Sequence, residues 1–220
     1  MKKALTGADI PVRDPVVDSK RGDLLSLPWE QWFQRLGEWI DGVVYPDTFW
    51  DDLRFPAQGI NPAGTSAPPT VVTADPWAGT LLFSASATNV VVGTAQMPHA
   101  WKEGTDVEPH IHWCPTSTHT GNVAWRFSYQ VANIGATFPA TLTTAGILVD
   151  AGDGTTNKHQ VHDFADIDMD GKTISCMIVW KLERVGGNVA DTYTGTARFL
   201  ELDFHYEIDS PGSAEETTKT

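Results

Sequence analysis

Two histidines, His110 and His112, are the residues whose type and spacing most directly suggest chemistry. They close the pattern G-x5-H-x-H that begins at Gly104, and alternate residues of a β-strand point to the same face of a sheet. Both imidazoles could therefore bind one metal ion, with His205 from the last predicted strand as a third ligand. The carboxylate that would complete such a set is missing from residues 113–117. The alternative is a histidine pair on a polar sheet face or at a subunit seam, and we favour that interpretation.

A second candidate is the acidic run Asp166, Asp168 and Asp170, which Gly171 follows. Alternate carboxylates before a tight glycine turn match the opening half of a calcium-binding loop. The bidentate glutamate of such a loop is absent, because Met177 occupies the twelfth position, and the flanking segments look like strands rather than helices. A solvated hairpin turn in an acidic protein explains the run without a metal, and we prefer it.

The signatures of three common enzyme classes are absent. The sequence contains no G-x-S-x-G, no G-x-x-x-x-G-K-[ST] and no G-x-G-x-x-G. Its 220 residues include 15 Lys or Arg and 28 Asp or Glu, which gives a net charge of −13. Such an acidic surface repels phosphate groups, so we expect no direct contact with nucleic acid and no membrane partner. We also expect no enzymatic activity, no cofactor and no bound metal.

The elements that would position these residues begin with an arm and a helix. Prolines at positions 11, 15 and 28 predict an extended arm over residues 1–28. Residues 29–41 predict one short amphipathic helix with an aromatic stripe at helical spacing. Such a helix could pack on its own sandwich or dock onto another chain, since large aromatic side chains also anchor protein contacts, and the stripe is our candidate docking surface. Its members are Trp29, Trp32, Phe33, Leu36, Trp39 and Ile40.

The rest of the chain predicts a mainly β protein. Residues 42–70 are rich in proline and predict a long connection. Over residues 71–208 the hydrophobic period changes to two, with glycine-containing turns between eight or nine short runs. This pattern predicts an antiparallel β sandwich, with a jelly roll as first choice and an open barrel as second. Residues 209–220 predict a flexible tail.

Several segments resemble known families. The histidine pattern resembles the first half of the cupin metal signature, and cupins are jelly rolls; the second cupin motif is not recognisable. Residues 16–36 (VVDSKRGDLLSLPWEQWFQRL) resemble the leading segment of tailed-bacteriophage virion proteins, and residues 49–70 resemble the linker that follows it in such proteins. Residues 97–113 and 199–213 resemble the β-rich body of phage structural proteins encoded near head and tail genes.

The phage resemblance implies a role in building the particle. The expected function is that of a non-enzymatic virion structural protein of the collar, adaptor, fibre-base or capsid-decoration type, located in the virion and assembled in the host cytoplasm. Its partners would be portal or neck, tail or capsid proteins, and a homotrimer is favoured. The arm and helix would attach it, and the acidic β body would face outward. The alternative is a cupin-like metal-binding enzyme or a carbohydrate-binding module that uses His110 and His112.

Overall fold

The chain divides into two units, Met1–Asp47 and Thr48–Thr220, in a computed structural model. Each unit is described by itself, and the second is called the body below. The structure describes residues 16–18, 24, 25, 27–40, 49–60, 62, 64–72 and 75–219. None of the described helices is long and apolar enough to cross a membrane.

The first unit contains one helix and one pair of short strands. Strands β1 (Val17–Asp18) and β2 (Leu24–Leu25) pair antiparallel within the segment predicted to be an extended arm; the other residues of that arm, except 16, 27 and 28, lie outside the described residues. Helix α1 spans Leu27–Ile40, so it begins two residues before the predicted start. Pro28 lies in its first turn, where a missing backbone N–H costs little because that group has no partner within the helix.

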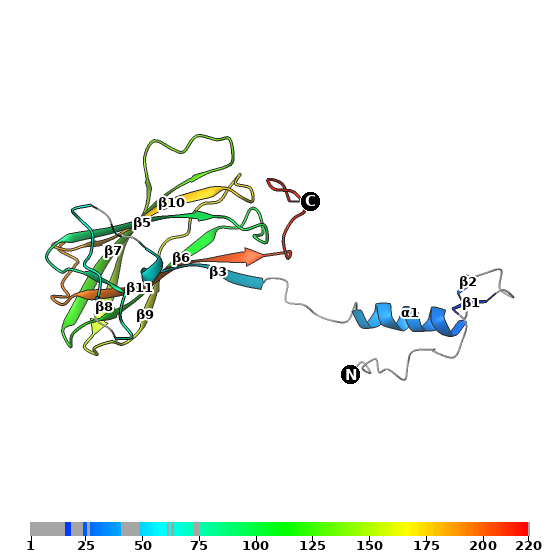
Figure 1. Ribbon diagram of the computed structural model, residues 1–220, viewed down its shortest axis with the longest axis horizontal. Coiled ribbons are helices and arrows are strands. Elements are labelled where there is room, and N and C mark those ends of the chain that lie inside the picture. The colour runs from blue at the N-terminus through cyan, green and yellow to red at the C-terminus, as the bar shows by residue number, and fades with distance from the viewer. Residues whose placement is uncertain are drawn as a thin grey trace. The chain divides into compact units, whose positions relative to one another are not determined.

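The described part of the body contains nine strands and a short 3-10 helix at Ala57–Gly59 (Figure 1). The strands are β3 (Phe49–Pro56), β4 (Leu81–Phe83), β5 (Thr88–Gln96), β6 (Val107–Pro115), β7 (Thr120–Ala132), β8 (Thr143–Asp153), β9 (Gln160–Asp163), β10 (Met177–Val185) and β11 (Ala197–Ile208).

The strand order is that of a jelly roll. One sheet has the order β5-β10-β7-β8, and the other has the order β3-β11-β6-β9, with β4 also paired to β11. Between β4 and β11, every connection from one strand to the next crosses from one sheet to the other, except that between β7 and β8, which lie in the same sheet. All pairings in the two sheets are antiparallel, which confirms the predicted antiparallel sandwich.

The body begins earlier than the sequence predicts. The predicted connection over residues 42–70 contains β3, which pairs with β11 from Glu201↔Pro56 to Ile208↔Phe49. The prolines around this segment made it look like a connection in the sequence. Strand β3 tolerates Pro56 because β3 is an edge strand and the proline is its last residue. The predicted strand over residues 71–74 is not formed at Val71 and Val72; only Thr70 makes an isolated bridge, to Leu81.

The segment that was predicted to be a flexible tail makes contacts with the body. In the described residues 209–219, Lys219 forms an ion pair with Asp209 and donates to the backbone carbonyl of Ala100 at 3.2 Å. Ser175 Oγ donates to the carbonyl oxygen of Glu216 at 2.9 Å. Two of these contacts join the tail to the body, at Ala100 and Ser175, and the flexibility of the tail stays a prediction.

The core lies between the two sheets and is rich in aromatic rings. Four tryptophans are at most 1% exposed: Trp101, Trp113, Trp125 and Trp180. Trp125 contacts the ring of Phe83 edge-on at 5.2 Å and that of Trp113 at 6.0 Å between ring centroids. Along much of β5, β6 and β10, buried residues alternate with more exposed ones, which is the period-two pattern that predicted the sandwich.

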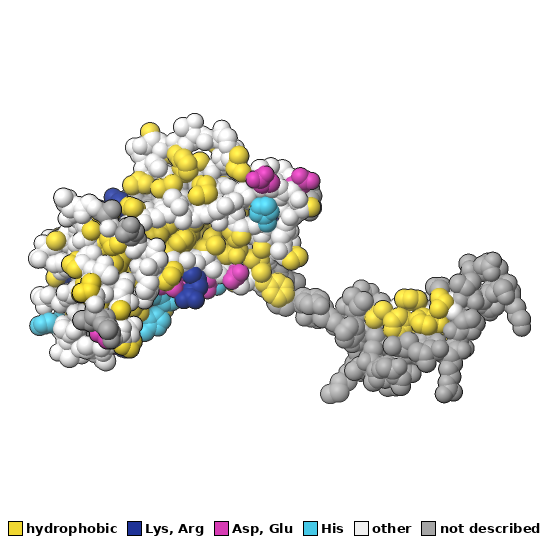
Figure 2. Space-filling view, viewed as in Figure 1, with side chains coloured by type: hydrophobic (Ala, Val, Ile, Leu, Met, Phe, Trp, Pro, Cys, Tyr) yellow, Lys and Arg dark blue, Asp and Glu magenta, His cyan; other side chains and the backbone are white. Residues whose placement is uncertain are grey.

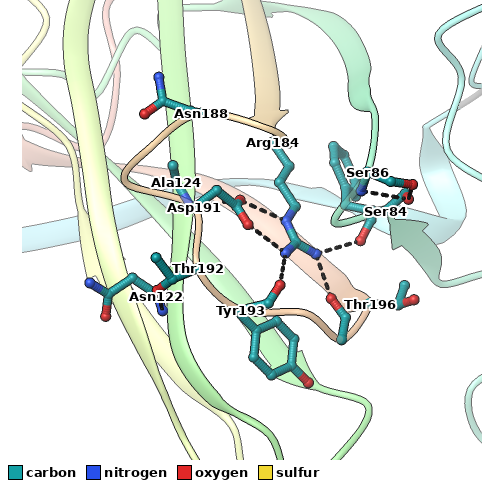
Figure 3. Close-up of polar contacts among 12 residues, drawn as sticks. Ser84, Ser86, Asn122, Ala124, Arg184, Asn188, Asp191, Thr192, Tyr193 and Thr196 are labelled. Carbon is teal, nitrogen blue, oxygen red and sulfur yellow. Dashed lines mark hydrogen bonds and ion pairs between the residues drawn. The ribbon is translucent and has the colours of Figure 1, made fainter.

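One charged side chain is fully enclosed in this core. Arg184 of β10 is 0% exposed, and its guanidinium pairs with Asp191 through N···O distances of 2.9 and 2.8 Å (Figure 3). Its remaining N–H groups donate to the backbone carbonyls of Phe83, Tyr193 and Gly195. Arg184 therefore joins the loop between β10 and β11 to the end of β4.

Candidate functional site

Three of the predicted interface residues of α1, Trp29, Trp32 and Phe33, form an aromatic cluster. Trp32 contacts Phe33 edge-on at 5.1 Å and Trp29 at 5.9 Å between ring centroids. Phe33 is 47% exposed, and Trp29, Trp32 and Leu36 are half-buried. The side chains of Trp39 and Ile40 lie outside the described residues. The helix thus presents apolar aromatic surface within the first unit.

The histidine pair lies on the outer face of the five-stranded sheet. Ile111 and Trp113 of β6 are fully buried in the core, so the alternating His110 and His112 point away from it. The pair therefore does not form a site enclosed within the sandwich.

A β-bulge brings acidic residues of β11 to the same face. Phe199 and Leu202 both point into the core, and the register with β6 shifts between Phe199 and Glu201. The extra residue, Leu200, reverses the alternation, so that Glu201 lies opposite His112 and Asp203 lies opposite His110. Without this shift both carboxylates would point into the apolar core. Bulges commonly redirect side chains in this way next to functional sites.

Asp203 lies between the two histidines. Its Oδ2 is 3.2 Å from His112 Nε2, and its Oδ1 is 3.6 Å from His110 Nδ1. Asp203 is only 5% exposed, and among the described residues its Oδ1 has no hydrogen-bond partner. The hydrogen bond with Asp203 raises the pKa of His112. The carboxylate is thus buried with one oxygen unsatisfied.

The cluster opens into a shallow pocket of about 500 Å³. Arg54 of β3 donates to both carboxylate oxygens of Glu201, at 2.9 and 2.7 Å. His159 stacks on His112, and His112 Nδ1 lies 2.8 Å from His159 Nε2. The lining residues are Arg54, Pro56, Gln58, His112, His159, Leu200 and Glu201. In the body as drawn in Figure 2, histidine, acidic and basic side chains gather near β3 and β9.

His205, the predicted third ligand, takes part in a separate contact. Its Nδ1 is 2.7 Å from Asp52 Oδ1, and its ring stacks on Trp50 with centroids 4.6 Å apart. Its ring centroid is 5.5 Å from that of His110. The structure therefore places all three predicted histidines on one face but does not converge them on one point.

Within the described residues, one trio of His, Cys, Asp and Glu ligand atoms lies within 4.8 Å of one another: His112, Glu201 and Asp203. The predicted acidic run Asp166, Asp168 and Asp170 is not such a group. Asp168 Oδ1 instead accepts the backbone N–H of Asp170 at 2.9 Å, as in a local turn. Sequence reasoning missed Glu201, Asp203 and His159, because the pairing of β6 with β11 and its bulge are long-range features.

Comparison with known proteins gives only distant similarity. No protein-family model matches the chain, and no curated protein matches it in sequence. The insecticidal delta-endotoxin Cry8Ea1 from Bacillus thuringiensis aligns over 76% of this chain and 25% of its own, with 10% identity and a TM-score of 0.40.

Two structures of infectious bursal disease virus, of the Gx and Gt strains, each align over 78% of this chain and 44% of their own. Their identities are 8% and 11%, and their TM-scores are 0.28 and 0.26. The chain thus spans less than half the length of each of these structures. Similarity this weak carries no argument about function, and the jelly-roll assignment stands on the strand order alone.

Proposed function

We propose that the chain is a non-enzymatic structural protein of a tailed-bacteriophage particle, which attaches through α1 and presents its jelly-roll body outward. The observation that carries this proposal is the aromatic surface of α1 in a unit separate from the body. The sequence resemblance to phage virion proteins supports a tailed phage as the type of particle.

The short length of α1 and its exposed aromatic surface favour docking on a partner protein. An isolated helix of 14 residues is marginal in water, and its stability ordinarily comes from burying one face. Burying a large apolar side chain contributes about 1.5–3 kcal/mol. Phe33, with 47% of its surface exposed, and the half-buried Trp29 and Trp32 leave part of this free energy available for docking on another protein.

The body has what an outward-facing module needs. Its described core of buried aromatic and aliphatic side chains is formed by residues after position 48, and we propose that the body folds without α1. Its acidic character suits a solvent-facing surface rather than contact with packaged DNA. We propose portal or neck, tail or capsid proteins as partners, and a homotrimer as the assembled form.

The test is a pair of matched substitutions in the phage that encodes the chain. Phe33→Asp places a charge in the aromatic cluster, and the control Gln34→Asp places the same charge at the next, exposed helical position. Phe33→Asp should remove the protein from purified particles, whereas Gln34→Asp should leave its copy number unchanged. Normal incorporation of Phe33→Asp would refute attachment through this helix.

A truncated chain separates attachment from folding. Deleting residues 1–47 retains every strand of both sheets, because β3 begins at Phe49. This body should remain soluble, unfold cooperatively and fail to join the particle. If it aggregates instead, α1 contributes to the core of the body and the proposed division of roles is incorrect.

A further inference from the structure

We propose that the outer face of the five-stranded sheet binds one divalent transition-metal ion, of the zinc class, through His112, Asp203 and Glu201. These residues supply three potential ligand atoms that all lie within 4.8 Å of one another. The inference goes beyond the proposed structural function and does not depend on it. It also departs from the expectation, drawn from sequence, that the protein holds no metal.

The state of Asp203 points to a missing cation. A buried carboxylate ordinarily pairs with a cationic side chain or accepts several hydrogen bonds, because an uncompensated buried charge is costly. Asp203 is 5% exposed, and no described residue donates a hydrogen bond to its Oδ1. His112 Nε2 lies 3.2 Å from the other oxygen, Oδ2, whereas His110 Nδ1 lies 3.6 Å from Oδ1, too far for a hydrogen bond. A cation would satisfy this oxygen.

The contact between Asp203 and His112 has the spacing of two ligands on one ion. Zinc ligands lie about 2.0–2.2 Å from the metal, so two ligand atoms in a tetrahedral site are about 3.4 Å apart. The observed separation of Asp203 Oδ2 and His112 Nε2 is 3.2 Å. Little movement of either side chain is therefore needed to admit a metal between them.

The contact with His159 can hold the ring of His112 in the tautomer that a metal requires. If Nε2 is the ligand, Nδ1 carries the hydrogen, and His159 Nε2 lies 2.8 Å from Nδ1 in position to accept it. Outer-shell partners of this kind commonly orient metal-binding histidines. In this tautomer the lone pairs of His112 Nε2 and Asp203 Oδ2 face each other, so the gap must hold a proton or a metal ion.

The donor types of the three ligands, with Glu201 as the third, determine the class of ion, and the pocket gives the ion access. Arg54 holds Glu201 through one hydrogen bond to each oxygen, which leaves further lone pairs on that carboxylate. An imidazole with two carboxylates favours zinc or a similar transition metal over calcium or magnesium, which prefer oxygen ligands alone. The pocket of about 500 Å³ beside His112 and Glu201 gives the ion a route from solvent.

Zinc titration of the full-length, tag-free protein tests this inference. The chain is first stripped with a chelator, and zinc binding is then measured by calorimetry, with cobalt absorbance as a report on coordination. We expect one equivalent of zinc and a cobalt spectrum typical of nitrogen and oxygen ligands. Asp203→Asn and His112→Gln should each weaken zinc binding by at least about tenfold, the loss that even outer-shell changes cause.

The matched control is His205→Gln. His205 lies on the same face and also contacts a carboxylate, that of Asp52, but it is not one of the three ligands. This variant should bind zinc as the unaltered chain does. Circular dichroism checks that each variant is folded; if Asp203→Asn is not, the half-buried His112→Gln carries the test.

Three results would overturn the inference. The first is no zinc binding by the unaltered chain, which would leave a proton as the occupant of the gap. The second is unchanged binding in a folded His112→Gln or Asp203→Asn variant. The third is an equal loss in His205→Gln, which would show diffuse binding by a histidine-rich face.

Discussion

Replacing Arg184 by methionine should lower the unfolding free energy of the body by about 3–5 kcal/mol. The side chain is 0% exposed, and its partner Asp191 has a side chain only 1% exposed. Methionine fills much of the same space but donates no hydrogen bond. It would leave the Asp191 carboxylate buried without its cationic partner and the carbonyls of Phe83, Tyr193 and Gly195 without this donor. Breaking a buried pair from one side is costly for this reason.

Thermal and urea unfolding, followed by circular dichroism, measure this loss. For a domain of this size each kcal/mol corresponds to about 2–4 °C, so the melting temperature should fall by about 6–20 °C. The matched control is Arg126→Met. Arg126 Nε donates to Glu183 at 2.7 Å, but its side chain is 34% exposed, and Lys181 remains 3.1 Å from the same carboxylate. The control should therefore cost about 1 kcal/mol or less.

Equal losses in the two variants would refute the reasoning, because burial would then not distinguish the pairs. The double variant Arg184→Met with Asp191→Leu refines the test. It removes both charges, so it should recover part of the stability that Arg184→Met loses alone. If the double variant is less stable than the single one, the unpaired Asp191 is not the source of the cost.

Three further predictions follow from the core and its ionisable groups. Trp125→Ala should cost about 3–5 kcal/mol by urea unfolding, since the ring is 0% exposed, and a loss below about 1 kcal/mol would contradict its place in the core. Burial alone would raise the pKa of Glu183, but hydrogen bonds from two basic neighbours outweigh it and lower the pKa below 4.5. The ionised Glu183 therefore stabilises the fold above pH 4.5, and this stabilisation is lost as the pH falls through the lowered pKa. The Glu183→Gln variant should accordingly lose less stability on acidification than the unaltered protein, as measured by urea unfolding at several pH values. Burial raises the pKa of Cys176 to about 11, so a thiol reagent at pH 8 should modify it only after unfolding; rapid modification of the native protein would show that the thiol is accessible.

Sequence reasoning succeeded where local periodicity decides the structure. The alternation of Trp125, Phe127 and Tyr129 with smaller or polar residues placed β7 and its inward face, and these rings are buried. The spacing of glycine-containing turns set the approximate number of strands. Both signals come from residues that are neighbours in the sequence, so they can be recognised without knowledge of tertiary contacts.

The missed strand β3 shows the limit of such reasoning. Trp50, Asp52 and Arg54 alternate with Leu53 and Phe55, which pack against the core, so the period was present. Nearby prolines made the segment look like a connection. Pairing with the long strand β11 decided its structure, and that pairing is not visible locally.

The candidate site depends even more on long-range register. The histidines on β6 were predicted to share a face, and they do. The bulge at Leu200 turned Glu201 and Asp203 outward, and no local signal predicted that reversal. The cluster of His112, Glu201 and Asp203 is therefore a product of strand pairing rather than of a sequence motif.

The most direct test of the central proposal is imaging of the intact phage particle by electron cryomicroscopy, at a resolution that traces this chain. We predict that α1 lies against another virion protein with Trp29, Trp32 and Phe33 at the contact, while the jelly-roll body projects into solvent. A map in which the body makes the contacts and α1 is uncovered would contradict attachment through the helix. Absence of the chain from purified particles would contradict the virion role itself.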